Sequence, residues 1–563
     1  MPDAHFPLDG VCYLAPEDSA RYRALGCWVE TTAGDLLRAA ARKHPDKPFL
    51  ITAERRISYA EFDADSERLG AALLGIGLNP GDRALFQMGT VIETAVALFG
   101  CFKAGIIPVC SLAQYRDIEM GELARRSEAK AWFVQADFSA FDLAGFALRL
   151  APKHPAMREI IVARSPSEPG TAKAGTRCFE TLISSISLEE ARARLAGVNI
   201  GTEDVLTFQL SGGTTGVPKI IPRFHAEYLG CSRDWGRRNA LAADSVQLYA
   251  LPLIHNAGQI SALFPSLIAG CSLVLMQRVD PKVFFDWVEE ERVTHSLNIG
   301  PALAQMLDYR DVARHDVSSI KLLTGFNRSD ILERHLGVPC CNIFGITEGV
   351  LMCSAPGDPS EARHKTIGHP MSGHDEIRLL EPGSEHEVPF GSTGECCFRG
   401  PSTTRGYFRM PEANRSSFTA DGFFRTGDMM AAHRIAGMVC YSFEGRIKDN
   451  IDRGGEKFGA EEVENLIGRH PDVADAKVVA MPDRIYGEKA CAFLMMRPGA
   501  TALTVKTLGT YLISLGLAKF KLPERIEYID AFPVTRVGKV DKAALRGRVA
   551  DKLAAEQKIS PEN

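Results

Sequence analysis

The stretch 210-LSGGTTGVPK-219 combines glycines, hydroxyl side chains and a lysine directly after an apolar, strand-like run. Backbone N–H groups of successive glycines can form a concave nest for an anion, and a lysine adds a point charge. This chemistry predicts contact with phosphate, although a plain surface turn can have the same composition. The residues concerned are Ser211, Gly212, Gly213, Thr214, Thr215, Gly216 and Lys219.

This loop differs from the common nucleotide-binding loop. That loop needs G-x-x-x-x-G-K-[ST], whose lysine opens a helix and is followed by a hydroxyl residue. Here Pro218 precedes Lys219, and Ile220 follows it. Pro218 also disfavours helical geometry at Val217. The sequence therefore excludes a kinase or GTPase of the P-loop type.

Four further motifs follow in order, and they are 342-NIFGITEG-349, 424-FRTGD-428, 444-EGRIKDNIDRGGEKFGAEEVE-464 and 533-PVTRVGKVDK-542. With the loop they resemble the core motifs of the adenylate-forming superfamily, which includes acyl-CoA synthetases, peptide-synthetase adenylation domains and luciferases. The resemblance extends from about residue 30 to 550. It implies ATP and Mg²⁺ as cofactors. It also implies that a carboxylate attacks the α-phosphorus, releasing pyrophosphate and leaving an acyl-adenylate.

The resemblance implies a role for each matching residue. Thr347 matches a threonine beside the α-phosphate, and Glu348 matches the magnesium-binding carboxylate, which suits a hard cation. Asp428 matches the acceptor for both ribose hydroxyls, and Arg446 a ribose and phosphate contact. Lys539 matches the lysine that bridges the attacking carboxylate and the α-phosphate, where charge moves during in-line attack.

The same resemblance implies a second step, in which a C-terminal lid rotates and a thiol attacks the adenylate. Lys448 occupies the hinge position. Gly454 and Gly455 match a loop that approaches a pantetheine arm, where absent side chains permit close contact. A plain turn is the alternative for R-G-G-E-K. Lys542 is expected to be solvated.

The segment 251-LPLIHNAGQISALFPSLIAG-270 is expected to select the acid. Its apolar positions repeat at helical spacing, which predicts a helix packed on a core. Pro265 should kink that helix or free a carbonyl. Asn256 lies near the helix start, while Ala257 and Ser261, four residues apart, share another face. The apolar positions are Ile260, Leu263, Phe264, Leu267 and Ile268.

Amino-acid-activating relatives usually have an aspartate where Asn256 stands. The H-N pair followed by Ser261 resembles the aryl-acid branch, which includes 2,3-dihydroxybenzoate–AMP and salicylate–AMP ligases. Asn256 is then expected to bond a 2-hydroxyl, and Ser261 a neighbouring polar substituent. His255 either borders the pocket or is merely packed.

The sequence departs from the aryl-acid pattern at three places. Ala257 stands where a tyrosine is common, which predicts a roomier pocket. Phe326, in 325-GFN-327, replaces a small residue before the adenine. Leu351 resembles the salicylate-type choice, whereas Ser261 resembles the dihydroxybenzoate-type choice. Because the last two signals conflict, we predict only the class of substrate, which is a hydroxylated aromatic or heteroaromatic acid.

The lead hypothesis is an aryl-acid–AMP ligase that loads the phosphopantetheine thiol of an aryl carrier protein. No attachment-serine motif follows residue 542, so the carrier is expected to be a separate protein. A stand-alone aryl-CoA ligase, with coenzyme A as acceptor, is the first alternative. A non-catalytic binding protein on the same fold is the second.

The elements that must position these residues alternate along the chain. Strand-like apolar runs are separated by helical patterns such as 282–293, which predicts an α/β fold with parallel sheets covered by helices. The resemblance implies doubly wound α/β layers. The apolar runs are 205–210, 246–253, 273–276, 320–323 and 340–344.

Turn signals recur every few residues from 391 to 445, which predicts a β-rich subdomain. The charged stretch 444–457 has little to bury and is the best domain boundary. We expect an N-terminal core over 1–446 and a small mobile C-terminal α/β lid over 447–563.

Bulk composition is typical of a soluble, multidomain protein of 563 residues. The net charge of −5 recommends neither nucleic acid nor an anionic membrane as a partner. Neither a signal peptide nor a membrane span is recognisable. The 14 cysteines lack C-x-x-C spacing, which favours free buried thiols in a reducing cytoplasm over zinc ligation.

Overall fold

The computed structural model describes residues 3–165, 173–211, 218–298, 301–325, 328–453, 456–483, 486–515, 517, 519–535 and 539–559. Several predicted site residues lie outside the described residues, as does the side chain of Lys448. They are Gly212, Gly213, Thr214, Thr215, Gly216, Phe326, Gly454 and Gly455.

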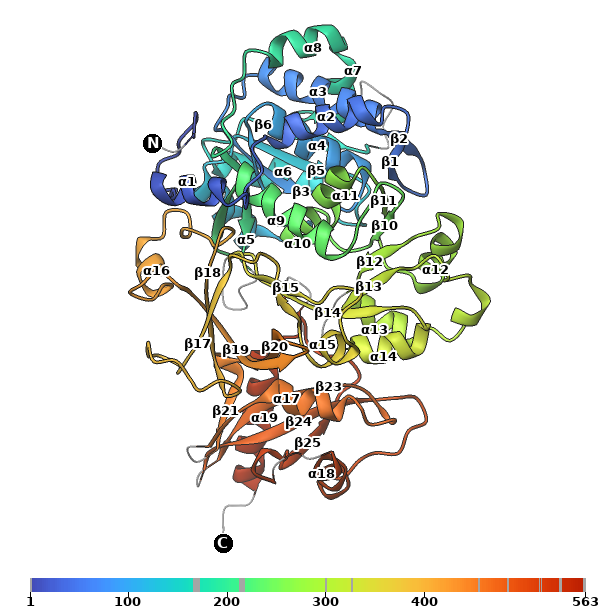
Figure 1. Cartoon of the computed structure of the whole chain (residues 1–563), viewed down its shortest axis with the longest axis vertical. Helices are drawn as coiled ribbons and strands as arrows, with labels where there is room; N and C mark the ends of the chain where they lie inside the picture. The colour runs from blue at the N-terminus through green and yellow to red at the C-terminus, as the bar shows by residue number, and fades with distance from the viewer. Residues whose placement is uncertain are drawn as a thin grey trace. The chain divides into compact units, whose positions relative to one another are not determined.

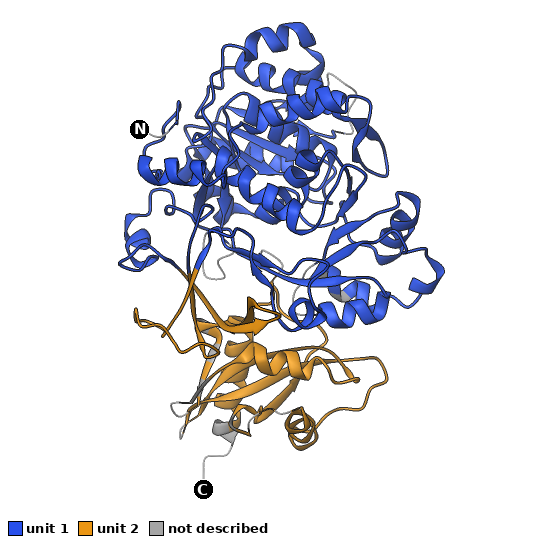
Figure 2. Ribbon diagram, viewed as in Figure 1, with its two compact units in different colours: residues 1–376, 398–424 blue, residues 377–397, 425–563 orange. Residues whose placement is uncertain are grey.

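The chain divides into two compact units (Figure 2). Unit 1 comprises residues 1–376 and 398–424, and unit 2 comprises 377–397 and 425–563. The predicted boundary at 446 and the hinge at Lys448 stay predictions.

Unit 1 contains two mainly parallel sheets (Figure 1). In the first, the strand order is β7-β6-β5-β3-β4-β8-β9, with only β9 antiparallel to its neighbour. The apolar run predicted at 205–210 coincides with β8. The strands are β3 (Arg83–Gln87), β4 (Ile107–Val109), β5 (Ala131–Gln135), β6 (Glu159–Ala163), β7 (Arg177–Cys178), β8 (Val205–Leu210) and β9 (Ile220–Phe224).

The second sheet has the order β16-β15-β14-β13-β12-β10-β11-β1-β2. It is parallel from β14 to β1 and antiparallel at both edges. The strands are β1 (Pro48–Ile51), β2 (Arg56–Ser58), β10 (Val246–Tyr249), β11 (Ser272–Leu275), β12 (His295–Leu297), β13 (Leu322–Gly325), β14 (Cys340–Gly345), β15 (Leu351–Cys353) and β16 (His369–Pro370).

Helices cover these sheets. The longest are α3 (Tyr59–Gly75), α9 (His225–Arg238), α4 (Ile92–Lys103), α2 (Ala33–Lys43), α5 (Asp117–Ser127) and α12 (Pro281–Glu290). The shorter helices are α1 (Pro16–Ala24), α6 (Leu143–Leu150), α7 (Phe179–Ser184), α8 (Leu188–Leu195), α10 (Asn256–Gly258), α11 (Phe264–Ala269), α13 (Pro301–Asp308), α14 (Ser329–Leu336), α15 (Ser360–Lys365) and α16 (Pro411–Ser416).

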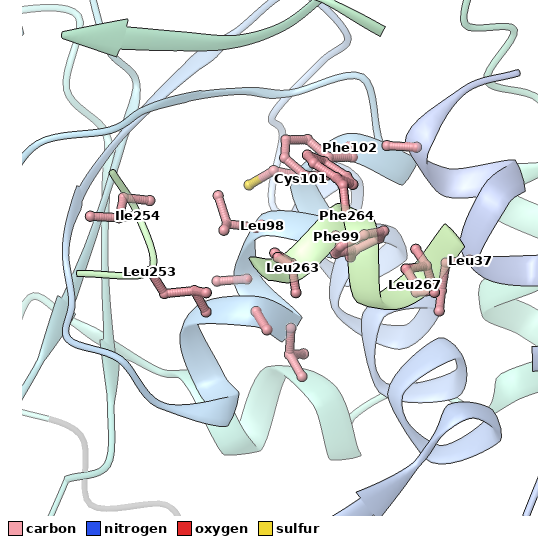
Figure 3. Packing of buried hydrophobic residues seen from close by; sticks show 14 of the residues in the cluster. Leu37, Leu98, Phe99, Cys101, Phe102, Leu253, Ile254, Leu263, Phe264 and Leu267 are labelled. Carbon is pink, nitrogen blue, oxygen red and sulfur yellow. The ribbon is translucent and has the colours of Figure 1, made fainter. Parts of the chain in front are cut away.

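The main core of unit 1 surrounds α4, whose residues are all buried. A helix that is largely apolar on every face is expected inside a core rather than at a surface. Figure 3 shows Phe99 and Phe102 of α4 beside Phe264 of α11. Their ring centroids lie 5.8 and 6.0 Å from that of Phe264. The predicted acid-selecting segment is therefore anchored in the core.

Unit 2 is built around antiparallel strands. One sheet has the order β17-β18-β19-β20, and the other β22-β21-β24-β23 with β25 beside β24. The strands are β17 (Glu376–Leu380), β18 (Thr393–Arg399), β19 (Phe424–Ile435), β20 (Met438–Arg446), β21 (Asn450–Arg453), β22 (Glu456–Gly459), β23 (Val473–Asp483), β24 (Gly487–Met496) and β25 (Arg525–Tyr528). The helices are α17 (Ala460–Ile467), α18 (Val505–Ser514) and α19 (Lys542–Ile559).

The α/β prediction is confirmed, with parallel layers in the N-terminal part and a small C-terminal α/β domain. All fourteen cysteines are free, and all except Cys12 and Cys178 are buried. Among the helices described, none combines the length and the apolar character needed to cross a membrane.

Candidate active site

Glu348 lies between β14 and β15 and has a neutral hydrogen-bond donor. The Tyr407 hydroxyl donates to Glu348 Oε1 over 2.9 Å. The backbone N–H of Thr404 donates to the Glu348 carbonyl over 2.7 Å. Burial raises the pKa of Glu348, and the Tyr407 hydrogen bond and the charges of Lys219 and Arg223 offset only part of that increase. The carboxylate is thus held in place without a direct salt bridge from any described residue.

Lys219 closes the predicted phosphate loop. The Ser211 N–H donates to the Lys219 carbonyl over 2.9 Å, and the Lys219 N–H donates to Ser211 Oγ over 3.0 Å. These bonds join the two ends of the loop where β8 and β9 pair. Lys219 Nζ lies 4.1 Å from the ring centroid of Tyr407. Tyr407 therefore contacts both the loop lysine and Glu348.

Thr347 is buried beside the same loop. Its hydroxyl donates to the Leu210 carbonyl over 3.3 Å. Thr347 and Glu348, which follow β14, therefore lie near Ser211 and Lys219 at the ends of β8 and β9. Their roles in binding ATP stay predictions.

Arg223 connects these segments, and sequence reasoning missed it. Its side chain is 2% exposed and forms an ion pair with Glu227. Its remaining N–H groups reach the Thr347 carbonyl at 2.7 Å and the Ser402 carbonyl at 3.1 Å. A buried cation is stable only when its donors are satisfied, as here. Arg223 lies in β9 and Glu227 in the first turn of α9, so no regular spacing in the sequence predicts this ion pair.

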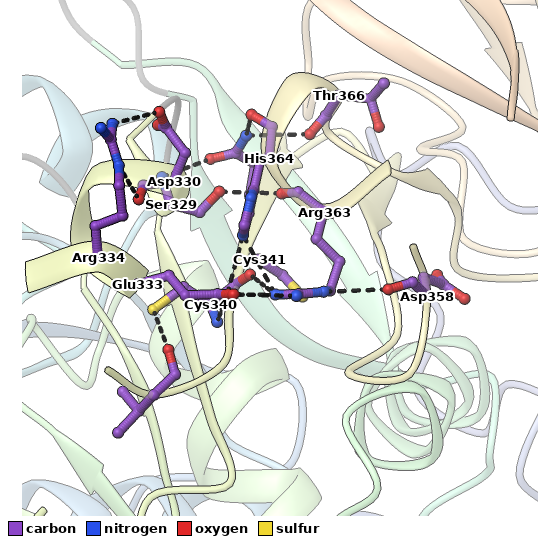
Figure 4. Close-up of polar contacts among 12 residues, drawn as sticks. Ser329, Asp330, Glu333, Arg334, Cys340, Cys341, Asp358, Arg363, His364 and Thr366 are labelled. Carbon is purple, nitrogen blue, oxygen red and sulfur yellow. Dashed lines mark hydrogen bonds and ion pairs between the residues drawn. The ribbon is translucent and has the colours of Figure 1, made fainter. Parts of the chain in front are cut away.

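A second network, which is partly buried, fixes the start of β14 (Figure 4). Glu333 of α14 accepts from both terminal nitrogens of Arg363, from His364 at 2.9 Å and from the Cys340 N–H at 2.8 Å. Burial opposes ionisation of Glu333, but these donors hold its pKa at about 2. The anchored strand then leads directly to Thr347 and Glu348.

Asn256 is oriented by a tyrosine that the sequence did not reveal. The Tyr228 hydroxyl, from α9, donates to Asn256 Oδ1 over 2.7 Å. Asn256 is 6% exposed. With its oxygen engaged by Tyr228, the amide presents its N–H₂ group, which is a donor. His255 is exposed, and its Nδ1 accepts from the Ala257 N–H over 3.2 Å, so it caps its own helix.

The helix after Asn256 widens into a π-helical turn, η2 (Gln259–Leu263). The Phe264 N–H bonds to the carbonyl of Gln259, five residues back. Pro265 lacks an N–H and cannot donate to the Ser261 carbonyl four residues before it, and the helix departs from α-helical geometry immediately before this proline. The Ser261 hydroxyl donates to the Ala257 carbonyl, which places these two predicted pocket residues on one face.

Sequence reasoning also missed the polar residues that contact Cys110, which come from this turn and from β8. Gln259 donates to the Ile254 carbonyl at 3.1 Å and to Cys110 Sγ at 3.3 Å. Gln209 donates to the same sulfur at 3.3 Å. Burial raises the pKa of the Cys110 thiol to about 12, so it is a neutral packing group rather than a nucleophile.

Leu351 is buried in β15, opposite Gly345 of β14. It belongs to the same apolar cluster as Ile260, against which Ala257 packs. The acid-selecting roles of Leu351, Ala257 and Ser261 stay predictions.

Unit 2 holds the predicted ribose site. Asp428 and Arg446 are direct partners across β19 and β20, and Arg446 Nε lies 3.0 Å from Asp428 Oδ1. Asp428 is 2% exposed. The antiparallel register brings the pair together although 18 positions separate the residues in the sequence.

Two lysines near the C-terminus differ in environment. Lys539 is exposed; its carbonyl accepts from the Thr535 N–H over 2.6 Å, and its N–H donates to Thr535 Oγ1 over 3.3 Å. Lys542 was expected to be solvated, and this was wrong. Its side chain is 16% exposed and its Nζ lies 2.6 Å from Glu464 Oε1, because α19 packs against β23. The catalytic role of Lys539 stays a prediction.

Two family models match the chain. The AMP-binding enzyme model matches residues 37–408, and the model of the AMP-binding enzyme C-terminal domain matches residues 462–539. The first alone covers more than half of the sequence.

Curated relatives match nearly the whole chain. "Pyochelin synthase PchD" from Pseudomonas aeruginosa (strain UCBPP-PA14) is 38% identical over 546 residues, which are 95% of each chain. "2,3-dihydroxybenzoate-AMP ligase" from Bacillus subtilis (strain 168) is 35% identical over 556 residues, covering 97% of this chain and 99% of the relative.

A solved structure is also similar over nearly the whole chain. The apo structure of Mycobacterium smegmatis MbtA superposes with a TM-score of 0.71 and 32% identity, covering 96% of this chain and 99% of that one.

Proposed function

This chain belongs to the AMP-binding enzyme family, and on that premise we propose that it activates a hydroxylated aromatic or heteroaromatic acid with ATP. The product is the acyl-adenylate, which a phosphopantetheine thiol on a separate carrier protein then attacks. The observation that carries the proposal is the end-to-end similarity to a named 2,3-dihydroxybenzoate-AMP ligase.

In the first half-reaction, a carboxylate oxygen of the acid attacks the α-phosphorus of ATP. The bond from that phosphorus to the oxygen of pyrophosphate breaks, and pyrophosphate leaves. No protein nucleophile is required, so the enzyme contributes positioning and charge neutralisation. The loop closed by Ser211 and Lys219 is assigned to the β- and γ-phosphates, and Thr347 to the α-phosphate.

Glu348 fits a magnesium site. Mg²⁺ typically uses one or two carboxylates plus substrate phosphates rather than an all-protein cage. Accordingly, no cluster of three or more histidine, cysteine or acidic ligands occurs among the described residues. Bound Mg²⁺ would neutralise phosphate charge. The Tyr407 hydrogen bond leaves Glu348 Oε2 as the second carboxylate oxygen for the ion.

Asp428 is assigned to the ribose hydroxyls and Arg446 to ribose and phosphate. Lys539 is assigned to the charge that develops between the acid and the α-phosphate. For the acid, the buried N–H₂ group of Asn256 is a suitable donor to a ring hydroxyl oxygen, and Tyr228 keeps it in that orientation. An α-ammonium would need an acceptor there, so the same geometry disfavours amino acids.

The acceptor thiol separates two versions of the proposal. A carrier-protein arm and coenzyme A both present phosphopantetheine, and Gly454 and Gly455 would allow the arm to approach. An aryl-CoA ligase is therefore the second candidate. The free cysteines favour a reducing compartment, and we propose the cytoplasm.

Acid-dependent exchange of labelled pyrophosphate into ATP tests the first half-reaction. The panel should contain salicylate, 2,3-dihydroxybenzoate, larger hydroxylated aryl and heteroaryl acids, benzoate, fatty acids and amino acids. We expect exchange with a 2-hydroxyaryl or related heteroaryl acid and much less with benzoate, which lacks the hydroxyl. Turnover of only fatty or amino acids would refute the proposal.

The acceptor is tested with the preferred acid. Thioester formation is compared with coenzyme A and with a phosphopantetheinylated aryl carrier protein. A much higher kcat/KM with the carrier supports the lead version, and a higher value with coenzyme A supports the second candidate.

A further inference from the structure

The segment 402–408 of unit 1 contacts both parts of the chain to which the phosphates and the magnesium ion are assigned. The Thr404 N–H donates to the Glu348 carbonyl over 2.7 Å. The Phe408 N–H donates to the carbonyl of Ile220, the residue after the loop lysine, over 2.9 Å. The backbone of this segment is therefore fixed on either side of its tyrosine.

Tyr407 is held by the fold independently of the two charged side chains that it contacts. Its N–H donates to Asn414 Oδ1 over 2.7 Å, and its carbonyl accepts from Asn414 Nδ2 over 3.0 Å. Tyr407 is 5% exposed. A ring that is buried and whose backbone is fixed in this way can determine where flexible neighbours lie.

Glu348 and Lys219 meet different parts of this ring. The Tyr407 hydroxyl donates to Glu348 Oε1 over 2.9 Å, whereas Lys219 Nζ lies 4.1 Å from the ring centroid. The ammonium thus contacts the π face, where a cation is attracted by the ring quadrupole. Among the described residues, neither Glu348 nor Lys219 forms an ion pair. Both charges therefore stay available to a ligand instead of neutralising each other.

The hydroxyl also favours the form of Glu348 that a metal ion needs. Burial raises the pKa of Glu348, and the hydrogen bond from Tyr407 is the largest interaction that opposes this increase. A hydroxyl that donates to a carboxylate stabilises its ionised form. The same bond restricts the orientation of the carboxylate.

We propose that Tyr407 is a positioning residue for Mg²⁺ and ATP. Its hydroxyl orients the Glu348 carboxylate for the divalent ion, and its ring keeps the Lys219 ammonium beside the phosphate loop and unpaired with that carboxylate. The inference rests on the proposed function, because it assumes that Glu348 binds the ion and Lys219 a phosphate.

Calorimetry of ATP binding to the full chain at several Mg²⁺ concentrations tests the role of the hydroxyl without any acid substrate. Tyr407→Phe removes the hydroxyl and keeps the ring. The Mg²⁺ concentration for half-maximal enhancement of ATP binding should rise about tenfold, since a hydrogen bond to a charged group is lost. Pyrophosphate exchange should show the same shift. Tyr309→Phe, which removes a hydroxyl bonded to His315 at 2.8 Å, is the matched control and should show none.

A double substitution tests whether the hydroxyl acts through the carboxylate. In the Glu348→Gln background, Tyr407→Phe should have little further effect on the Mg²⁺ dependence, because residues that act through one contact are not additive. A merely structural role of the hydroxyl would give independent effects.

The ring is tested with Tyr407→Leu, which removes the π face as well. At saturating Mg²⁺ its Kd for ATP should be about threefold above that of Tyr407→Phe, since the cation–π contact is lost. In the Lys219→Met background the two variants should bind ATP equally. A difference that persists there would contradict the role of the ring.

Failure of this inference differs from failure of the proposed function. Wild-type exchange combined with an unchanged Mg²⁺ dependence in Tyr407→Phe, or with independent effects in the double variant, overturns the inference alone. Mg²⁺-dependent ATP binding that shifts in Tyr407→Phe, without exchange for any acid, refutes the proposed function alone. A wild type that binds no ATP in the presence of Mg²⁺ refutes both.

Discussion

Glu348 in unit 1 and Asp428 in unit 2 are both carboxylates to which the proposal assigns a role in ATP binding, but their partners differ. Glu348 accepts from the neutral Tyr407 hydroxyl and has a raised pKa. Asp428 is paired with the guanidinium of Arg446. The first carboxylate is poorly compensated, and the second is compensated by the fold itself.

This difference suggests two kinds of recognition. A partly buried carboxylate without a salt bridge from a described residue, such as Glu348, gains most from a ligand that supplies a cation, such as a divalent ion bound to phosphate. A carboxylate that already has its cation is suited to neutral hydroxyl donors, for which it needs only to accept hydrogen bonds.

Lys539→Ala should have the largest effect. Losing a charge that stabilises the transition state should lower kcat for pyrophosphate exchange about a hundredfold to a thousandfold. ATP binding, measured by calorimetry, should be largely retained. Lys542→Met is the matched control, and it should mainly lower the Tm because it leaves Glu464 buried without its cation. Equal activity of Lys539→Ala and the wild type would refute the assigned role.

Glu348→Gln should follow, with a loss of about a hundredfold in kcat/KM, because a neutral amide is a weak magnesium ligand. Its Tm without ligands should stay unchanged or rise, since the variant removes a partly buried carboxylate whose pKa is raised and which has no salt bridge from a described residue. Magnesium titration of the exchange rate provides the measurement. If the variant keeps the magnesium dependence of the wild type, the ion is held elsewhere.

Asp428→Asn should raise KM for ATP about tenfold, because hydrogen bonds from the ribose to a charged acceptor are replaced by weaker ones. kcat should change much less, since the ribose lies away from the reacting bond. Glu412→Gln, on the exposed α16, serves as control. A loss confined to kcat would contradict the ribose role.

The smallest expected effect is the pH dependence of the free energy of unfolding that Glu461 of unit 2 contributes. Burial, followed by the nearby charge of Glu464, raises the pKa of Glu461 from 4.5 to about 7. A raised carboxyl pKa stabilises the protonated native state, so the free energy of unfolding should fall as pH rises from about 4.5 to about 7. Urea unfolding across this range should show the fall in the wild type.

Glu461→Gln should lose that component of the pH dependence, and Glu462→Gln, which removes a neighbouring carboxylate bonded to Lys521, is the control. Identical pH profiles for Glu461→Gln and the wild type would contradict the assignment.

Much of the fold could be predicted from local patterns. The run at 205–210 is β8, because five of its six positions are apolar or β-branched, which suits a buried strand. Pro265 predicted the perturbed helix, because a missing N–H acts wherever the proline stands. Lys542 was mispredicted, because a charged sequence context does not reveal which carboxylate will face it.

The sequence by itself determined which residues can be assigned to the reaction, because each motif is a short run of consecutive residues. The motifs contain Thr347, Glu348, Asp428 and Lys539. Only the tertiary structure decided their partners. Arg223 and Thr347 are 124 positions apart, and Tyr407 and Glu348 are 59 apart. Contacts over such separations depend on how strands and helices pack around a common core, and no local pattern of residues encodes that packing.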